Sequence, residues 1–95
     1  PGLNSGAAAV LVADAEWAEK KGLEPFARLV AFGVGAVDPN MFGLGPLPAV
    51  QQALNRAGWT IRYIERAEVN EAFAAIVLAL IKETGLPEDV VNVEG

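Results

Sequence analysis

The chain has 95 residues, a hydrophobic fraction of 53% and a net charge of −5. Its seven Lys and Arg residues form no cluster that could follow a phosphate backbone, which argues against nucleic-acid binding. It contains no Cys and no His, so disulfides, the usual zinc ligands and the usual nucleophile–base pairs are excluded, and we expect no metal.

The longest apolar run, residues 72–81, is too short to span a bilayer, so we expect no membrane insertion. No signal peptide is visible, which makes the cytoplasm the predicted location. The length suits one small domain or a piece of a larger one. The high apolar content predicts that further protein normally covers part of the surface.

Taken in chain order, short apolar runs alternate with helical patterns. The expected strands cover residues 7–13, 26–37, 65–69 and 90–93. The expected helices cover residues 15–21, 46–57 and 70–84. A β-α-β-α-β-α-β order of this kind is typical of an α/β layered fold.

Local signals mark where these elements begin and end. Asp14 and Asn70 are expected helix N-caps, and Gly22, Gly58 and Gly85 are expected to end the helices.

Apolar residues occupy both odd and even positions of residues 26–37, which predicts a strand covered on both faces. Gly33 and Gly35 share one face of that strand and would let another backbone approach closely. The helix at 70–84 is apolar nearly all round, which predicts burial on every side.

Three polar features could carry chemistry, and each has a structural alternative. The loop 43–46 (GLGP) could offer N–H groups to an anion or could simply be a tight turn. Glu65, Glu68 and Glu71 recur at intervals of three, as in an acid–base pair, but the spacing implies no single face. Asn70 could donate from its amide to developing negative charge or to a water that does so, but from these residues alone a helix cap is the favoured interpretation.

Residues 70–75 (NEAFAA) resemble the NEAF motif of thiolases, the acyl-CoA acetyltransferase family. Further segments resemble the family in the same order, namely GLNSGAAAVLVAD (2–14), GLEPFARLVAFGVGAVDP (22–39), FGLGPLPAVQQALNRAG (42–58) and VNVEG (91–95). The resemblance implies an internal piece, with residues 1–24 ending the N-terminal domain and residues 25–95 starting the C-terminal domain. It also implies the thiolase-like layered fold, in which two similar α/β halves are joined.

The family resemblance implies Claisen condensation of acyl-CoA, or its reverse, thiolysis of a 3-ketoacyl-CoA. In thiolases one Cys is acylated, a second Cys moves the α-proton, and a His with an Asn-held water stabilises the thioester oxygen. Of these groups the chain carries only the Asn, as Asn70, so the 95 residues alone are predicted to be inactive. The Cys residues and the His are expected outside the chain. CoA thioesters are the implied substrates, with no separate cofactor, and a homodimer or homotetramer is the implied assembly.

By position, the resemblance makes Leu3, Phe42, Ala72 and Phe73 candidates for contact with the acyl group or the CoA arm. Ordinary core packing is the alternative, above all for Leu3 and Phe73. Phe42 stands where many thiolases have Met, so the acyl pocket should differ in shape. A different class of function is also compatible with the missing Cys and His: a non-catalytic thiolase-like module for CoA or lipid binding, or for subunit packing.

Overall fold

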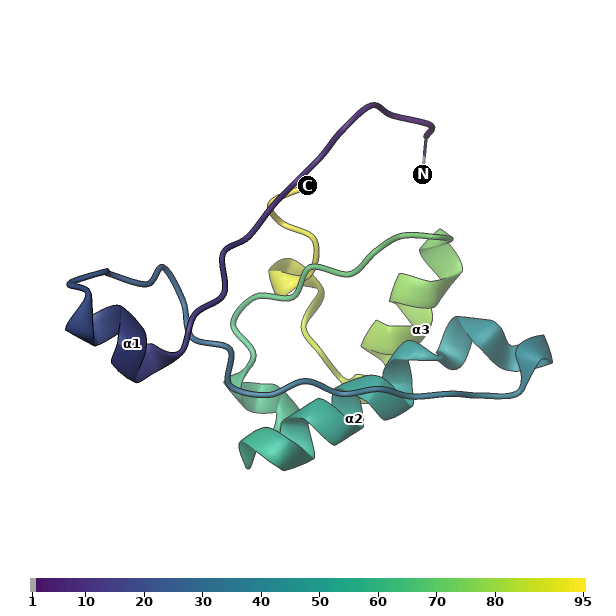
Figure 1. The fold of residues 1–95 in the computed structure, drawn as a ribbon. Helices are drawn as coiled ribbons and strands as arrows, with labels where there is room; N and C mark the ends of the chain where they lie inside the picture. Colours follow the sequence, from purple (N-terminus) through teal and green to yellow (C-terminus); the bar gives the residue numbers. More distant parts are fainter. Residues whose placement is uncertain (1) are drawn as a thin grey trace.

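The computed structural model describes residues 2–95, and its regular structure is helical (Figure 1). The α-helices (α) and 3-10 helices (η) are α1 (Ala15–Lys20), η1 (Pro39–Leu44), α2 (Pro46–Ala57), η2 (Ile61–Tyr63), α3 (Ala74–Thr84) and η3 (Glu88–Val90). Within the described residues, the β pairing consists of one isolated parallel bridge between Ala67 and Val91. The runs expected as strands otherwise lack a partner for a ladder, so the β-α-β-α-β-α-β order stays a prediction.

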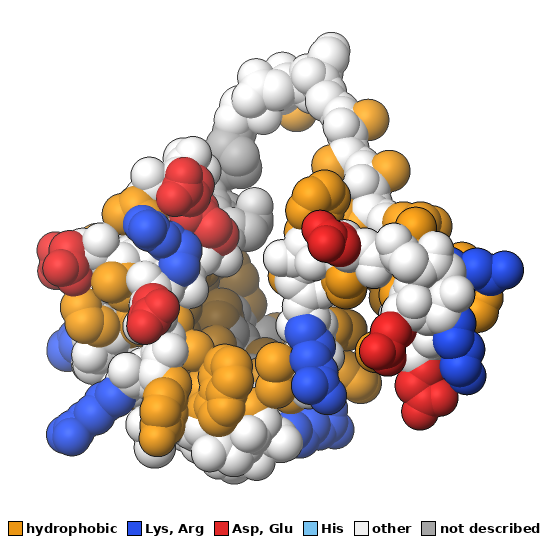
Figure 2. Space-filling view, turned by 90° about the vertical axis from the view of Figure 1, so that its left-hand side faces the viewer, with side chains coloured by type: hydrophobic (Ala, Val, Ile, Leu, Met, Phe, Trp, Pro, Cys, Tyr) orange, Lys and Arg blue, Asp and Glu red, His pale blue; other side chains and the backbone are white. Residues whose placement is uncertain are grey.

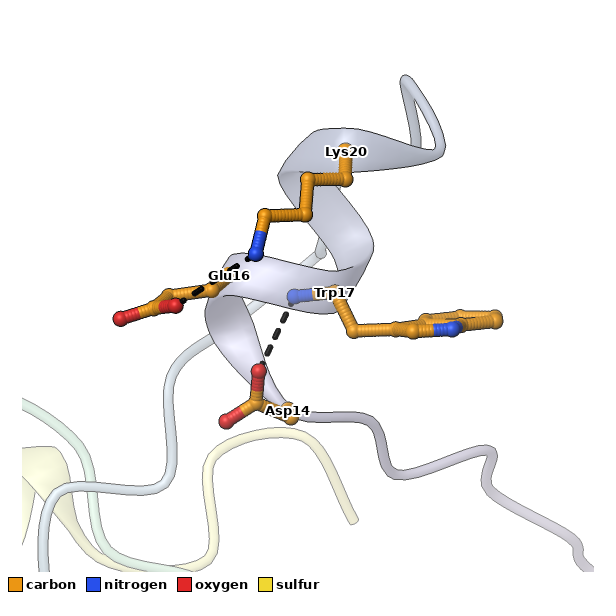
Figure 3. Close-up of polar contacts among 4 residues, drawn as sticks. All are labelled: Asp14, Glu16, Trp17 and Lys20. Atoms are coloured by element: carbon orange, nitrogen blue, oxygen red, sulfur yellow. Dashed lines mark hydrogen bonds and ion pairs between the residues drawn. The ribbon is translucent and has the colours of Figure 1, made fainter.

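Helix α1 begins and ends as its local sequence predicts, and Figure 3 shows the polar contacts among Asp14, Glu16, Trp17 and Lys20. The side chain of Asp14 accepts a hydrogen bond from the Trp17 N–H at 2.9 Å, which satisfies one of the free donors of the first turn. Glu16 and Lys20 form an ion pair at 3.7 Å, one helical turn apart. The chain leaves the helix through Gly22, whose φ of 66° is the left-handed conformation that glycine adopts at little cost.

Helix α2 lies against the extended chain of residues 26–37 (Figure 1), and two glycines allow the contact. A Cβ atom on Gly33 would lie 1.9 Å from the carbonyl oxygen of Ala49, and one on Gly35 would lie 2.7 Å from the Ala49 nitrogen. Both distances are far inside van der Waals contact, so only glycine fits. The predicted close backbone approach at these glycines is confirmed.

Two side chains of α2 tie the extended chain to the helix. Gln52 Oε1 accepts a hydrogen bond from the Val34 N–H at 2.9 Å. Arg56 donates to the Phe32 carbonyl at 2.8 Å, and its guanidinium lies 5.0 Å from the centroid of the Phe32 ring. The Phe32 and Val34 side chains are nevertheless exposed, so α2 covers one face of this run instead of the two predicted.

The small core is centred on α3. Its buried side chains there are Ile76, Val77, Leu80 and, just beyond the helix, Leu86. Helices α2 and η1 pack on α3, while Leu78 on the opposite side is exposed. The prediction that α3 is buried all round is therefore wrong for these 95 residues, because nothing among residues 2–95 covers that side.

The predicted start of α3 is also wrong. Its N-cap is Phe73, not Asn70, and the Phe73 carbonyl accepts the Ile76 N–H at 3.0 Å. Residues just before it are held in a different way, because Asn92 bonds both Val69 and the Glu71 side chain. These contacts keep the chain from entering the helix at Asn70.

The chain exposes more surface than a free-standing domain of its size. Its accessible area is 8041 Å², against about 5,200 Å² expected for a folded monomer of this mass. Its radius of gyration is 15.8 Å, against about 12 Å for a compact domain. Figure 2 shows hydrophobic side chains over much of one face and along the arm toward the N-terminus. This fits the expectation that further protein covers part of the chain.

No helix within residues 2–95 is both long enough and apolar enough to cross a bilayer.

Candidate functional site

The segment that precedes α3 and the segment at 90–95, which follows it, run side by side. The Ala67 N–H donates to the Val90 carbonyl at 2.9 Å, and the Asn92 N–H donates to the Ala67 carbonyl at 2.8 Å. An ion pair between Arg66 and Glu94 at 3.8 Å lies along the same pairing. The parallel bridge thus brings residues 90–95 against the loop that carries the NEAF motif.

The Asn92 side chain is the main polar link between the segments. Its Oδ1 accepts from the Val69 N–H at 2.6 Å, and its Nδ2 donates to the Val69 carbonyl at 3.1 Å. The same Nδ2 donates to Glu71 Oε1 at 2.9 Å. These bonds use the carbonyl and both N–H groups of the amide, so Asn92 fixes the residues on either side of Asn70.

A pocket of about 320 Å³ opens where the two segments diverge, and it is lined by Val69, Asn70, Glu71, Asn92 and Gly95. Asn70 is exposed, and among residues 2–95 its side-chain amide makes no hydrogen bond. An amide at the wall of a pocket, with its donors free, can bind a water or a group that gains negative charge.

Two of the predicted substrate-binding residues come together at the start of α3. The Phe42 ring, from η1, meets the Phe73 ring edge to face, with centroids 6.1 Å apart and planes at 70°. The two side chains are 60% and 63% exposed, so they offer apolar surface instead of filling a core. Ala72 is half-buried and lies in the sequence between Phe73 and the pocket residue Glu71.

Leu3 does not join this group. It lies on the extended arm of residues 2–14 (Figure 1) and its side chain is fully exposed, so it packs neither into the core nor against the aromatic pair. The structure therefore unites Phe42 with Phe73 and carries Asn70, Ala72 and Phe73 on one loop, but leaves Leu3 apart.

Two of the three acidic candidates, Glu68 and Glu71, and the glycine loop have structural uses. Glu71 accepts from Asn92, and Glu68 accepts the Glu94 N–H at 3.1 Å. The Gly45 N–H donates to the Phe42 carbonyl at 2.9 Å, so it is not free for an anion. These contacts favour the structural interpretation of the carboxylates and of the glycine loop. Within residues 2–95 no group of three or more acidic residues is placed to hold a metal ion.

Sequence reasoning missed Asn92. Its one local signal is a polar residue inside the apolar run VVNV, where a strand was predicted. The backbone there has a φ of 50°, a left-handed conformation that Asn adopts more readily than most residues.

Comparison with known proteins settles the family. Residues 23–95 match the family model described as "Thiolase, C-terminal domain". The chain belongs to the thiolase family. The thiolase resemblance of the NEAF motif and its flanking segments is thereby confirmed.

Relatives and solved structures agree with this assignment. The cytosolic acetyl-CoA acetyltransferase of Mus musculus is 44% identical over 94 residues, which is 99% of this chain and 24% of that protein. The 3-oxoadipyl-CoA/3-oxo-5,6-dehydrosuberyl-CoA thiolase of Escherichia coli K12 is 46% identical over 92 residues, 97% of this chain and 23% of that protein.

Among solved structures, human mitochondrial 3-ketoacyl-CoA thiolase in complex with CoA superposes with a TM-score of 0.82 at 37% identity. That match covers 87% of this chain and 21% of the human chain. The thiolase chain therefore spans about a quarter of the length of the relatives it matches. Its fold is that of the corresponding part of a thiolase, while the order of the strands stays a prediction.

Proposed function

We propose that this thiolase chain is part of a CoA-dependent acyltransferase in which Asn70 holds the water that stabilises the oxyanion. The complete protein would catalyse Claisen condensation of acyl-CoA or thiolysis of 3-ketoacyl-CoA. The observation that carries the proposal is the exposed Asn70 amide, which lines the pocket and makes no hydrogen bond within residues 2–95.

A helix cap would have used the Asn70 side chain, so its freedom needs another explanation. The N-cap of α3 is Phe73, three residues later, and the Asn70 amide is left out of the helix. Asn92 bonds the backbone of Val69 on one side of Asn70 and the side chain of Glu71 on the other, which restrains the chain that carries the amide. A fixed donor at the wall of a pocket is the arrangement that favours charge developing in a transition state.

The chemistry assigned to Asn70 is a hydrogen bond, not proton transfer. Its Nδ2 would donate to a water or keep it oriented, and that water would donate to the thioester oxygen as it becomes an enolate. Covalent catalysis needs an activated nucleophile with a base in reach, and the 95 residues contain neither Cys nor His. We therefore propose that these residues alone do not turn over substrate.

The aromatic pair is the proposed substrate side of the site. Phe73, on the same loop as Asn70, and Phe42, from η1, expose apolar ring surface at the start of α3. CoA thioesters are the proposed substrates, with Phe42, Ala72 and Phe73 beside the acyl group or the CoA arm. Leu3 would reach substrate only if the arm that carries it is folded against further protein. A cytoplasmic location and a homodimer or homotetramer belong to the same proposal, as does the domain boundary between residues 24 and 25.

Thiolysis of acetoacetyl-CoA by the full natural protein tests this function. The expected result is CoA-dependent loss of the substrate absorbance, with acetyl-CoA as product. Binding of CoA at equilibrium without any turnover would contradict the proposal and would favour the non-catalytic module instead.

A further inference from the structure

Asn92 ends a parallel pairing in an unusual way. Within residues 2–95 it is the one non-glycine residue with a positive φ, 50°. The bridge between Ala67 and Val91 precedes it directly. The backbone therefore turns away just as the ladder would continue toward Asn70.

The Asn92 side chain replaces the next pair of backbone hydrogen bonds in the ladder. In a continued ladder the Val69 N–H and carbonyl would bond the backbone carbonyl of Asn92 and the N–H of Glu94. Instead, the Asn92 amide accepts from the Val69 N–H at 2.6 Å and donates to its carbonyl at 3.1 Å. The Glu94 N–H bonds Glu68 Oε1 at 3.1 Å. One side-chain amide thus stands in for two peptide groups, and the segments can separate to form the pocket.

The Asn92 amide also bonds the residue that follows Asn70. Its Nδ2 donates to Glu71 Oε1 at 2.9 Å. Asn70 is therefore flanked by two residues that bond one half-buried amide, while its own amide bonds nothing within residues 2–95.

We propose that Asn92 is a positioning residue, which fixes the loop so that the Asn70 amide points at the reacting oxygen. The inference rests on the proposed function, because it needs Asn70 to act in turnover. It predicts that changes at Asn92 or at its contact with Glu71 lower kcat through Asn70, with little change in KM.

The first test uses Glu71, which is exposed and can be changed without opening the core. Glu71→Ala removes one bond of the Asn92 amide, whereas Glu71→Gln keeps an acceptor oxygen for it. In the full natural protein we expect Glu71→Ala to lower kcat for acetoacetyl-CoA thiolysis about tenfold and Glu71→Gln to restore most of it, because a small misplacement of a catalytic group is costly. An unchanged kcat in Glu71→Ala, or an equal loss in both variants, would overturn the inference.

The second test combines Asn92→Gly with Asn70→Ala. Glycine keeps the left-handed backbone and removes all three side-chain bonds, and we expect kcat to fall about a hundredfold. If Asn92 acts through Asn70, the same change made in Asn70→Ala should have almost no further effect. A full further loss there would overturn the inference and leave the proposed function intact. An unchanged kcat in Asn70→Ala alone would overturn the proposed function, and the inference with it.

Discussion

The contact between α2 and the extended chain at Gly33 allows a prediction with a magnitude. In Gly33→Ala the new methyl group would lie 1.9 Å from the Ala49 carbonyl oxygen and 2.8 Å from the Ala53 nitrogen. Both atoms belong to the backbone of a helix, so neither can rotate away. Ordinary contact begins near 3.4 Å, so the extended chain must move by roughly 1.5 Å from the helix.

That movement has a cost that can be estimated. Overpacking of this kind costs about 1–3 kcal/mol. Gln52 accepts a hydrogen bond from the extended chain and Arg56 donates one to it, and each bond contributes about 0.5–1.5 kcal/mol at best. Because those bonds are exposed and partly replaced by water, we expect a total loss of about 2–4 kcal/mol of unfolding free energy.

Urea denaturation of the full natural protein would measure this loss, with hydrogen exchange of the α2 amides to locate it. Gly6→Ala is a matched control, because a Cβ at Gly6 meets nothing within 4 Å and its φ is not positive. The reasoning predicts a lower midpoint and faster α2 exchange for Gly33→Ala only. Equal midpoints for the two variants would refute it.

Two further predictions concern the substrate side and the isolated chain. Phe42→Met replaces a stiff ring beside Phe73 with a flexible side chain. We expect the ratio of kcat/KM values between acyl chains of different length to change roughly 10- to 200-fold, which corresponds to about 1–3 kcal/mol. Unchanged ratios across a chain-length series would place Phe42 outside the acyl pocket. The 95 residues expressed alone should self-associate in analytical ultracentrifugation and show no thiolysis, given their exposed apolar surface; a monomer that melts cooperatively, or measurable turnover, would contradict this.

The parts of the fold that the sequence predicts well are those with local causes. Asp14 and the glycines at 22, 58 and 85 act within a few residues of their own position, and the helices begin or end there as expected. The close contact of Gly33 and Gly35 with the backbone of α2 is also predictable, because glycine inside an apolar strand pattern lets another backbone approach closely.

The parts that the sequence does not predict depend on distant partners. A strand exists only through a ladder, and within residues 2–95 the expected strands find one bridge. The cap expected at Asn70 failed because Asn92, 22 residues further along, holds the flanking residues instead. No local pattern could show that contact. Asn70 itself stood out through the NEAF resemblance, because an Asn before an apolar helix is otherwise best explained as a cap.

Turnover and stability of Asn70→Ala in the full natural protein test the central claim most directly. Asn55→Ala is the matched control, since Asn55 is an exposed asparagine on α2 whose side chain, among residues 2–95, bonds only Gln51. We expect Asn70→Ala to lower kcat about a hundredfold, as loss of one oxyanion donor does, with a melting temperature close to that of the control. A loss of stability that matches the loss of turnover, or full turnover without the amide, would contradict the role proposed for Asn70.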